Sequence, residues 1–389
     1  MKLTAAVNVL FVSSAFAGVV KRQTPFSDGQ PIDGKGKGAP ILDVENPSNL
    51  GQQSTDAGTV SNLKWRFSDS KTRIYPGGWV REQVDNDLPQ SHDIAAAQQH
   101  LKKGAIRELH WHRVAEWGQV LFGRVLVSAV DENGRHQVTE LGFGDIWYFP
   151  KGQAHTVQGL DDENEYLLAF DDGNFDAAGT TFNLDDWLAK TPKSILAKSF
   201  GLPESTFDNL PKTNPYIQNS TTGAAARQKN ITGGAGELVG EASYVYRTFQ
   251  HAPEPAPGGA GTIASTYVVL EPKGIRELHW HFTSEEWLYF HEGKARATVF
   301  TGNSNARTFD FGPGDTAVFP DNSGHYIENT SETQNLTWIE IYKADRVADV
   351  SLTQWLALTP ADIVADVLKL PLSVVEGLKK EKQVLVHGK

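Results

Sequence analysis

The sequence predicts an all-β protein built from two copies of one domain, and three observations support this. The heptapeptide IRELHWH occurs at residues 106–112 and again at 275–281, an offset of 169 positions. Segments rich in β-branched and aromatic residues, such as 119–130 and 295–300, are separated by turn-forming clusters at roughly 8–12-residue spacing, which is typical of a sandwich or barrel. Each copy then ends in segments that carry helix-start signals.

The repeat extends well beyond the heptapeptide. Residues 144–155 (GDIWYFPKGQAH) match 314–325 (GDTAVFPDNSGH), and residues 202–210 match 370–378. A period near 169 residues is far longer than the roughly 20–50 residues typical of solenoid repeats. We therefore interpret the chain as a duplicated domain.

The first residues read as a secretory signal peptide. Lys2 precedes an apolar run that ends at Phe16, and residues 15–17 (Ala-Phe-Ala) fit the small-x-small pattern of a cleavage site. The run is too short to span a membrane, and Lys21 with Arg22 resembles a dibasic processing site. We expect a secreted, extracellular protein. Four sequons agree with secretion and predict a glycoprotein: Asn219, Asn230, Asn329 and Asn335.

These signals predict the organisation of the whole chain. We expect a signal peptide at 1–17, a short propeptide at 18–22, an irregular N-terminal arm at 23–60, a first barrel domain at 61–211, a linker rich in small residues at 212–240 and a second barrel domain at 241–389.

Composition excludes several classes of function. The 389 residues carry a formal net charge of −11, with Lys and Arg scattered, so we expect no nucleic-acid partner. No segment after the leader is apolar enough to cross a bilayer, so no membrane partner is expected. The chain contains no cysteine, which excludes disulfides and thiolate zinc sites.

Short helices are predicted after each barrel. In the second copy, residues 359–362 (Thr-Pro-Ala-Asp) resemble a cap followed by proline at the first helical position. Residues 373–376 (Ser-Val-Val-Glu) fit a capping box, with Ser373 as the capping residue.

The heptapeptide supplies two metal ligands in each copy. On a strand, residues i and i+2 face the same side, so His110 and His112 point together, as do His279 and His281. A carboxylate and a third histidine complete each predicted set: Glu116 and His155 in the first copy, Glu286 and His325 in the second. Three imidazoles and one carboxylate form a mononuclear divalent-metal site, but these ligands alone do not separate manganese from iron or zinc.

The carboxylate of the second set had two candidates. Glu285 lies four residues after the second histidine, as Glu116 does in the first copy. Glu286 directly precedes a tryptophan, as Glu116 also does. We predict that Glu286 is the ligand and that one extra loop residue absorbs the difference.

The two motifs identify a family resemblance. The first copy matches GxxxxxHxHxxxxE and GxxxPxGxxH, the pair of cupin motifs, in full. In the second copy Gly274 lies one residue closer to His279, and residues 322–324 replace the Pro-x-Gly spacing. Almost the whole chain resembles the bicupin oxalate decarboxylase family of fungi and bacteria, which implies a duplicated cupin fold, the double-stranded β-helix or jelly-roll barrel, with short helical arms after each barrel. The resemblance further implies one Mn²⁺ per domain and two per chain, O2 as a cofactor, oxalate as substrate, and a homo-oligomer, often a trimer or hexamer.

Two arginines are the predicted substrate-binding residues. Arg107 and Arg276 each lie three residues before the first histidine of a set, so strand parity puts them opposite the ligand face unless a bulge intervenes. In the family that the chain resembles, the matching arginine holds the negative charge of the substrate.

The two copies differ at the groups expected to move a proton. Glu340 has Leu168 as its counterpart, and the resemblance implies that this glutamate is a proton donor. The first copy has four extra residues within 173–181, bounded by glycines, which we predict to be a lid. Asp176 is the only acid within 176–181, whereas decarboxylases of the family usually carry a glutamate there, so we predict Glu340 and Asp176 as catalytic residues.

The sequence thus predicts a secreted manganese oxalate decarboxylase, a carboxy-lyase that forms formate and CO2 from oxalate. The lid without glutamate leaves a bicupin oxalate oxidase, which forms CO2 and hydrogen peroxide, as the alternative. A non-catalytic bicupin storage protein is a more remote alternative, as are bicupin dioxygenases acting on aromatic acids.

Overall fold

The structure is a computed structural model of the 389-residue chain. It describes residue 56 and residues 60–220, 233–249 and 261–388, all of which belong to one compact unit. The predicted signal peptide, the propeptide and nearly all of the N-terminal arm lie outside the described residues, as does Asn230. The domain boundaries stated above therefore stay predictions.

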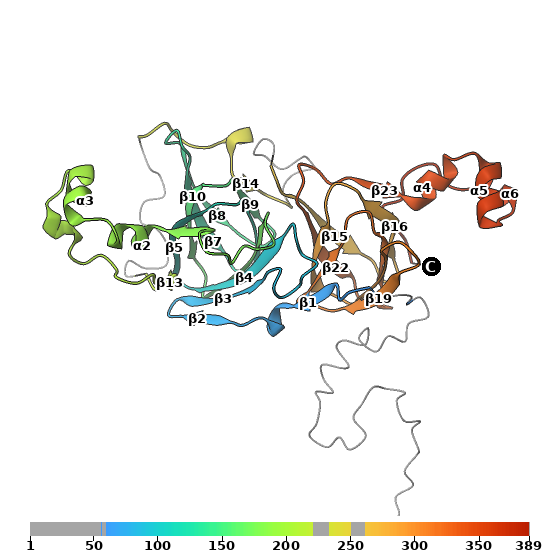
Figure 1. Ribbon diagram of the computed structural model, residues 1–389, viewed down its shortest axis with the longest axis horizontal. Helices are drawn as coiled ribbons and strands as arrows, with labels where there is room; N and C mark the ends of the chain where they lie inside the picture. Colours follow the sequence, from blue (N-terminus) through green and yellow to red (C-terminus); the bar gives the residue numbers. More distant parts are fainter. Residues whose placement is uncertain (1–55, 57–59, 221–232, 250–260, 389) are drawn as a thin grey trace, which may run out of the picture. The chain divides into compact units, whose positions relative to one another are not determined.

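The first barrel is made of two antiparallel β-sheets around one apolar core (Figure 1). One sheet has the strand order β14-β9-β6-β11-β4-β3-β2, and the other has the order β12-β5-β10-β7-β8, with β13 pairing with β5. The strands are β2 (Arg73–Tyr75), β3 (Gly78–Gln83), β4 (Ala95–Lys102), β5 (Ile106–His112), β6 (Glu116–Phe122), β7 (Val125–Val130), β8 (His136–Leu141), β9 (Ile146–Phe149), β10 (Ala154–Gly159), β11 (Glu163–Phe170), β12 (Thr181–Asn183), β13 (Ile217–Gln218) and β14 (Val245–Tyr246).

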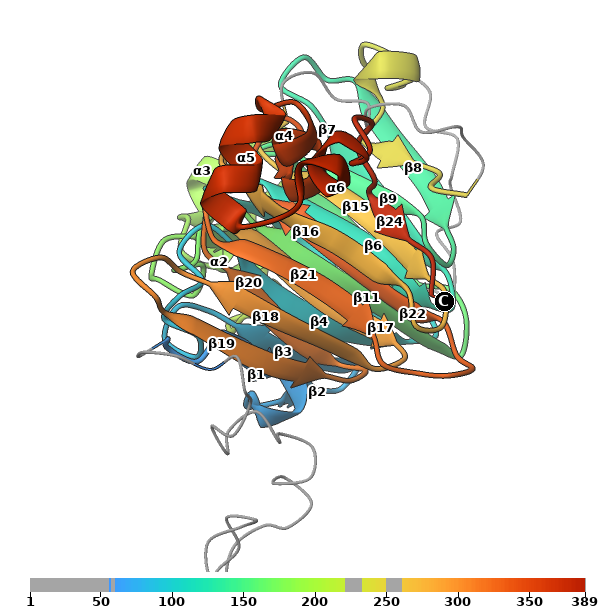
Figure 2. The same cartoon turned by 90° about the vertical axis from the view of Figure 1, so that its right-hand side faces the viewer.

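The second barrel repeats this plan. Its sheets have the strand orders β1-β20-β17-β22-β15 and β19-β18-β21-β16-β23, with β24 pairing with β16, and Figure 2 looks onto the second of them. The strands are β1 (Lys64–Arg66), β15 (Ala264–Leu270), β16 (Ile275–His281), β17 (Glu286–Glu292), β18 (Ala295–Phe300), β19 (Ala306–Phe311), β20 (Asp315–Phe319), β21 (Gly324–Asn329), β22 (Leu336–Tyr342), β23 (Asp349–Ser351) and β24 (Leu385–Val386). The predicted duplicated β-barrel fold is confirmed.

Alternation between buried and more exposed side chains explains why the strands with one outer face, such as β18, form sheets. In β18, the side chains of Ala295, Ala297 and Val299 are buried while those between them are partly exposed or exposed. Small and β-branched residues at the buried positions pack inside the second barrel against Phe309 and Trp338. Strand β9 of the first barrel alternates in the same way.

Each barrel borrows an edge strand from the segment that precedes the other barrel. Strand β1 comes before the first barrel in the sequence but pairs with β20 of the second. Strand β14 comes before the second barrel but pairs with β9 of the first. Buried ion pairs fix β1 in place, because Lys64 Nζ and Arg66 Nε lie 2.9 and 2.8 Å from the carboxylate of Asp315.

A third apolar cluster joins the two barrels. It contains buried side chains from both, including Trp117 and Leu167 of the first and Trp287 and Ile339 of the second. The indole Nε1 of Trp287 also donates a hydrogen bond across the junction to Gln83 Oε1, at 2.7 Å.

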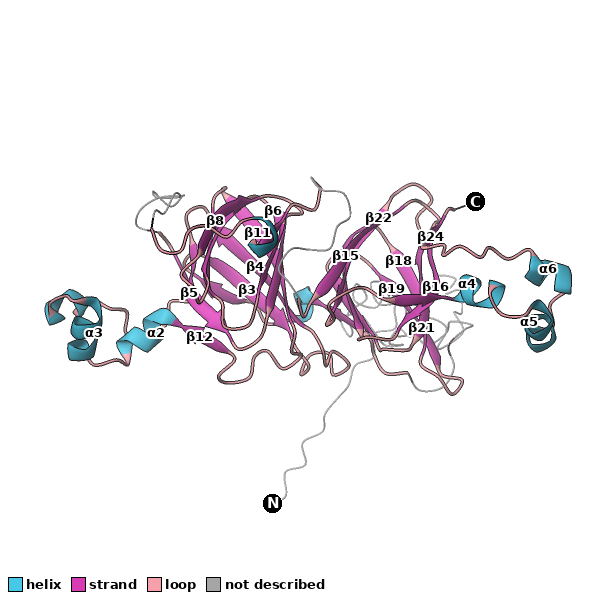
Figure 3. Ribbon diagram, turned by 90° about the horizontal axis from the view of Figure 1, so that it is seen from above, coloured by secondary structure: helices cyan, strands magenta, loops and turns pink. Residues whose placement is uncertain are grey.

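Short helices follow each barrel, as predicted, and Figure 3 shows them in cyan against the magenta strands. The helix α5 begins at Ala361, so Pro360 is its N-cap residue and not its first helical residue as predicted. The capping role predicted for Ser373 is also wrong: α6 begins at Leu372 after Pro371, which places Ser373 inside the first turn. None of the described helices is long and apolar enough to cross a membrane. The helices are η2 (Phe67–Asp69), α2 (Leu184–Ala189), α3 (Lys193–Phe200), η3 (Glu204–Phe207), η4 (Gly240–Ala242), α4 (Leu352–Ala357), α5 (Ala361–Leu368) and α6 (Leu372–Glu376).

Candidate metal centres

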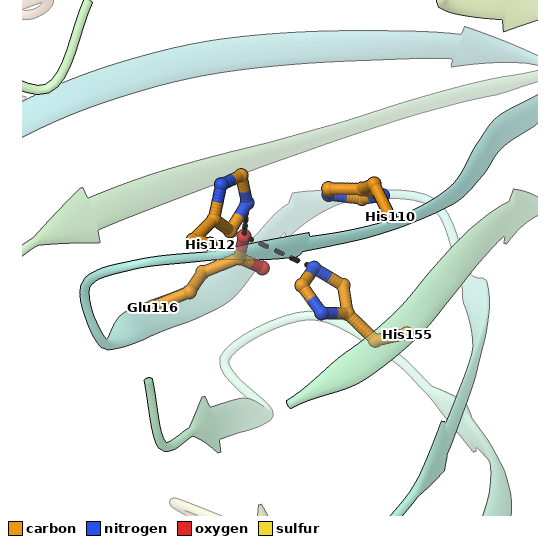
Figure 4. A group of neighbouring side chains, drawn as sticks. All are labelled: His110, His112, Glu116 and His155. Atoms are coloured by element: carbon orange, nitrogen blue, oxygen red, sulfur yellow. Dashed lines mark hydrogen bonds and ion pairs between the residues drawn. The ribbon is translucent and has the colours of Figure 1, made fainter. Parts of the chain in front are cut away.

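The first barrel gathers the four predicted ligands at one point (Figure 4). His110 and His112 project from alternate positions of β5, and Glu116 begins β6 directly after a short turn. His155 lies on β10 opposite His110 in the strand register. One ligand atom from each of the four residues lies within 4.8 Å of the others, and all four side chains are buried.

The second barrel forms the same cluster from His279, His281, Glu286 and His325. The register is again the cause, because β16 and β21 place His279 opposite His325. The rejected candidate, Glu285, turns away from this cluster. Its carboxylate accepts hydrogen bonds from the backbone N–H groups of residues 92–94 in the first barrel, at 2.8 to 3.3 Å.

Hydrogen bonds to carbonyl oxygens fix the tautomer of five of the six imidazoles. The Nδ1 atoms of His110, His155, His279 and His325 each lie 2.6 to 2.8 Å from a backbone carbonyl oxygen, to which Nδ1–H donates. The second histidine of each set has a different partner: Thr181 Oγ1 for His112 and the carbonyl oxygen of Ala348 for His281, both at 3.0 Å. Nδ1 is therefore occupied and Nε2 points into the cluster, which is the arrangement of metal-binding histidines.

Unpartnered atoms at the cluster centres fit a bound cation. The Nε2 atoms of His155, His279 and His325 are buried without a hydrogen bond, and so is Oε2 of Glu286. Buried polar atoms without partners are costly, and a divalent ion bound by these atoms would satisfy them. Three neutral nitrogens and one carboxylate are a suitable donor set for a first-row transition metal.

The electrostatics favour the protonation state that a metal requires at His110, His112 and both glutamates. Burial lowers the pKa of His112 to about 4 and lowers the pKa of His110 well below its ordinary value. Burial alone would raise the pKa of Glu116, but the adjacent imidazoles of His155 and His112 outweigh it and hold the pKa below its ordinary range. The pKa of Glu286 is lowered in the same way. His110 and His112 are thus neutral and both glutamates ionised at neutral pH, as metal binding requires.

Both arginines face the interior because of a β-bulge. Arg107 pairs with Val157 and His110 pairs with His155, so β5 advances three residues over the stretch in which β10 advances two. The extra residue reverses the strand parity and turns Arg107 to the ligand side. The same shift occurs between Arg276 and His279. The two guanidinium groups are both buried, at 3% exposure.

The two arginines have different partners. Arg107 Nη1 lies 2.9 Å from Glu108 Oε1, and its guanidinium lies 3.8 Å from the centre of the Tyr216 ring. Tyr216 has a φ of 56°, a conformation uncommon for a residue with a side chain. Arg276 Nη2 instead lies 3.2 Å from Asp349 Oδ2.

Glu340 lies inside the second barrel beside the metal cluster. Trp338 Nε1 donates to its Oε1 at 3.0 Å, and its Oε2 lies 2.9 Å from the oxygen of the Tyr342 hydroxyl. Burial first, and then the charge of Glu286, raise the pKa of Glu340 to about 7. The first barrel has the apolar side chain of Leu168 at the equivalent register position.

The predicted lid covers the first cluster with an aromatic ring. Phe175 is buried and stacks on Phe170, with ring centres 3.5 Å apart and planes 7° apart. Its centre also lies 5.2 Å from the His112 ring. Asp176 has an exposed side chain outside the cluster, and its charge is one of the causes, after burial, that raise the pKa of Asp87.

Sequence reasoning missed three residues next to the clusters: Trp147, Tyr216 and Tyr342. Trp147 Nε1 donates to Glu116 Oε1 at 2.8 Å, and the Tyr342 hydroxyl donates to Glu286 Oε1 at 3.1 Å. A signal for two of them was available, because the aligned repeats carry tryptophan against Ala317 and tyrosine against Phe170. Tyr216 falls in the predicted linker, where composition gives no such signal.

Known proteins match the chain over most of its length. The family described as "Cupin" matches residues 67–207 and 243–373. The chain is 56% identical to a probable oxalate decarboxylase of Arthroderma benhamiae, over 92% of this chain and 93% of that protein. It is 41% identical to the oxalate decarboxylase OxdC of Bacillus subtilis, over 92% of this chain and 97% of that protein.

Solved structures agree with the sequence matches. The Bacillus subtilis oxalate decarboxylase at pH 4.6 superposes with a TM-score of 0.83 at 41% identity, covering 91% of this chain and 95% of that one. Another structure of that enzyme, which superposes with a TM-score of 0.84, is described as one in which the Mn(II) centres were studied. With the cupin family matching two stretches of the chain and two matching metal clusters, the chain belongs to the bicupin oxalate decarboxylase family of cupins.

Proposed function

We propose that the chain is a manganese-dependent oxalate decarboxylase, which converts oxalate and a proton to formate and CO2. The observation that carries the proposal is the pair of buried three-histidine, one-glutamate clusters, each with an inward-facing arginine, in a chain 41 to 56% identical to proteins named oxalate decarboxylase. A dianion requires positive charge in a site that excludes water. A metal ion and one arginine supply that charge in each barrel.

Manganese is the metal we propose, one ion per barrel, with O2 as the second cofactor. The donor set fits several divalent metals, and the choice of manganese rests on the Mn(II) centres of the Bacillus subtilis relative. When bound, the ion would supply a Lewis acid for a substrate carboxylate and one-electron chemistry with O2.

The residues of the chain have three roles in this proposal. Arg107 and Arg276 hold and orient the substrate carboxylate in their respective barrels. Phe175 excludes water from the first cluster while its ring stacks on Phe170. Glu340 delivers a proton to the carbon that remains after CO2 leaves, since it is buried next to the second cluster, whereas Asp176 is exposed.

Oxalate oxidase is the second candidate, and one observation favours it. The lid over the first cluster has no carboxylate directed inward, because Asp176 is its only acid and lies at the surface. Without a proton donor there, the substrate would be oxidised fully to two CO2, with both electrons reducing O2 to hydrogen peroxide.

One assay separates these functions. Manganese-loaded protein is given oxalate under air, and formate, hydrogen peroxide and CO2 are measured together. One formate per CO2 with little peroxide supports the decarboxylase. One peroxide per oxalate without formate supports the oxidase. Metal-loaded protein that yields neither product contradicts both and favours a storage protein.

Two pairs of variants locate the chemistry. Glu116→Gln and Glu286→Gln each weaken one cluster and leave the other intact, so the larger loss of turnover identifies the working barrel. Glu340→Gln should lower formate production by about 100-fold or more if this residue donates the proton, while Asp176→Ala should change it little. Equal effects of the last two variants would contradict the role given to Glu340.

We further propose that the chain forms a homo-oligomer, a trimer or hexamer. Apolar side chains are exposed on the outer faces of both barrels and on the helices after them, and such faces are typical of interfaces. Sedimentation velocity tests this, and a monomer at micromolar concentration would contradict it. The exposed side chains include Leu109, Phe182, Trp187, Leu278, Phe282, Trp355, Leu358 and Val367.

We also propose that the protein is secreted and glycosylated. The leader at residues 1–17 supports secretion, and Asn219 and Asn335 have exposed side chains that could carry glycans. Asn329 is not a suitable acceptor, because its buried Nδ2 donates to three backbone carbonyls. Mass spectrometry of protein from the culture medium tests the mature N-terminus and the glycosylated positions.

A further inference from the structure

In the first cluster, one carboxylate oxygen of Glu116 accepts a hydrogen bond from a tryptophan. Trp147 on β9 is fully buried, and its Nε1 donates a hydrogen bond to Glu116 Oε1 at 2.8 Å. The other oxygen, Oε2, lies 3.0 Å from His112 Nε2 and 3.3 Å from His155 Nε2. The carboxylate is therefore divided: one oxygen faces the imidazoles and the other accepts from the indole.

A glycine provides the space for this indole. Strands β6 and β9 place Gly118 directly opposite Trp147 in the register. A Cβ atom at position 118 would lie 2.1 Å from Trp147 Cε2, a distance that no side chain tolerates. Gly118 therefore allows the tryptophan ring to lie across the strand and reach the carboxylate two residues earlier.

The second barrel divides its carboxylate in the same way but with a different donor. Leu288 and Ala317 are paired in the register where the first barrel has Gly118 and Trp147, so no indole is present at that position. The Tyr342 hydroxyl donates to Glu286 Oε1 instead, at 3.1 Å, while Oε2 lies 2.8 Å from His325 Nε2.

The donors come from opposite neighbours of the ligand strand. Trp147 lies on β9, on one side of β6, while Tyr342 lies on β22, which corresponds to β11 on the other side. Phe170 occupies the register position of Tyr342, since Phe170 pairs with Glu116 as Tyr342 pairs with Glu286. The two barrels have thus reached one arrangement with two unrelated side chains, which indicates that the arrangement itself matters.

We propose that Trp147 is a positioning residue that keeps Glu116 a single-oxygen metal ligand, and that Tyr342 does the same for Glu286. A carboxylate with both oxygens free binds a cation through one or both of them. Binding through both oxygens would occupy a coordination position that is otherwise open to substrate or water. The inference depends on the metal clusters alone and holds for either reaction considered above.

The test measures coordination in full-length protein with one cluster at a time. His279→Ala with His281→Ala leaves only the first cluster, which is loaded with Mn²⁺. Proton relaxation then counts the exchanging waters on the ion, and electron paramagnetic resonance reports the symmetry of its ligands. In this background Trp147→Phe keeps an aromatic ring but removes the N–H donor. We expect the water count to fall by about one and the resonance spectrum to change.

A second substitution that introduces a tyrosine donor, as in the second barrel, should restore the metal coordination and makes the test specific. Adding Phe170→Tyr to Trp147→Phe places a phenol where Tyr342 lies in the second barrel, so the water count and spectrum should return toward those of the parent. A structural defect would not be repaired by a hydroxyl group on a neighbouring strand. If Trp147→Phe leaves both readouts unchanged, or if Phe170→Tyr fails to restore them, the inference is wrong.

The second barrel supplies an independent arm and a matched control. In protein that keeps only the second cluster, through His110→Ala with His112→Ala, Tyr342→Phe should produce the same change. Trp338→Phe should leave the coordination unchanged, because its indole donates to Glu340 rather than to a ligand. Tyr342→Phe without an effect would contradict the proposal even if the first-barrel variant failed to fold. None of these readouts requires oxalate, so they stand whether or not oxalate is the substrate.

Discussion

Glu285 offers the sharpest test of the energetics at the junction between the barrels. Its side chain is 6% exposed and accepts hydrogen bonds from the backbone of His92, Asp93 and Ile94. Burial raises the pKa of Glu285 from 4.5 to about 7, since the three donors only partly compensate for the lost solvation. The folded protein therefore binds a proton that the unfolded chain releases between these two pH values.

The sign and size of the effect follow from that difference. Because the folded pKa is raised, this group contributes stability at low pH that is lost as pH rises from about 4.5 through about 7. A shift of about 2.5 pKa units corresponds to about 3 kcal/mol in total, of which about 2–3 kcal/mol is lost between pH 5 and 8. Glu285→Gln removes the titration but leaves the N–H of His92 without an acceptor, at a cost of about 1 kcal/mol. The variant should be less stable than the parent at pH 5 and more stable at pH 8.

Urea unfolding of metal-free protein, followed by tryptophan fluorescence, measures this crossover. The buried histidines oppose it, because burial lowers the pKa of His112 to about 4 and so makes the fold more stable as pH rises. Comparison of parent and variant cancels that contribution. Glu292→Gln, at the exposed end of strand β17, which begins directly after Glu285, is the control and should change neither curve. If Glu285→Gln has the same pH dependence as the parent, the assigned ionisation is wrong.

Two further predictions concern the first barrel. Gly118→Ala should lower the free energy of unfolding by about 1–3 kcal/mol and weaken manganese binding, because the added methyl group overlaps the Trp147 ring. Gly142→Ala is the control and should be tolerated, because its methyl group meets only one side-chain carbon, at 3.8 Å. Equal urea midpoints for the two variants would contradict this prediction. Tyr216→Leu removes the ring that faces Arg107 and should raise KM for oxalate about 2- to 30-fold with a smaller change in kcat, while Tyr216→Phe retains the parent value. Loss of activity with Tyr216→Phe as well would show that the hydroxyl, and not the ring, is required.

The ligand clusters were accessible from sequence because they depend on short-range rules. Alternation along a strand places His110 with His112, and comparison of the two repeats distinguishes Glu286 from Glu285. Each of these inferences needs only neighbouring residues or a duplicated pattern. The structure places the selected residues together in both barrels.

The orientation of the arginines was not accessible in this way. Strand parity turns Arg107 away from the ligands, and only the bulge between Arg107 and His110 reverses it. A bulge is set by the pairing of two strands distant in the sequence, so the sequence of one strand does not reveal it. The donors to the carboxylates were missed for a related reason, since Trp147 reaches Glu116 from another strand through space left by Gly118.

The exchange of edge strands between the barrels affects how the chain folds during synthesis and whether its two halves could fold separately. During synthesis the ion pair of Arg66 cannot form until Asp315, 249 positions later, has been made, so the first of the described strands cannot complete its pairing until most of the chain has been synthesised. A gene split between the two repeats would yield halves that each expose an unpaired sheet edge and carry a strand belonging to the other. Neither half alone would contain every strand of its own sheet.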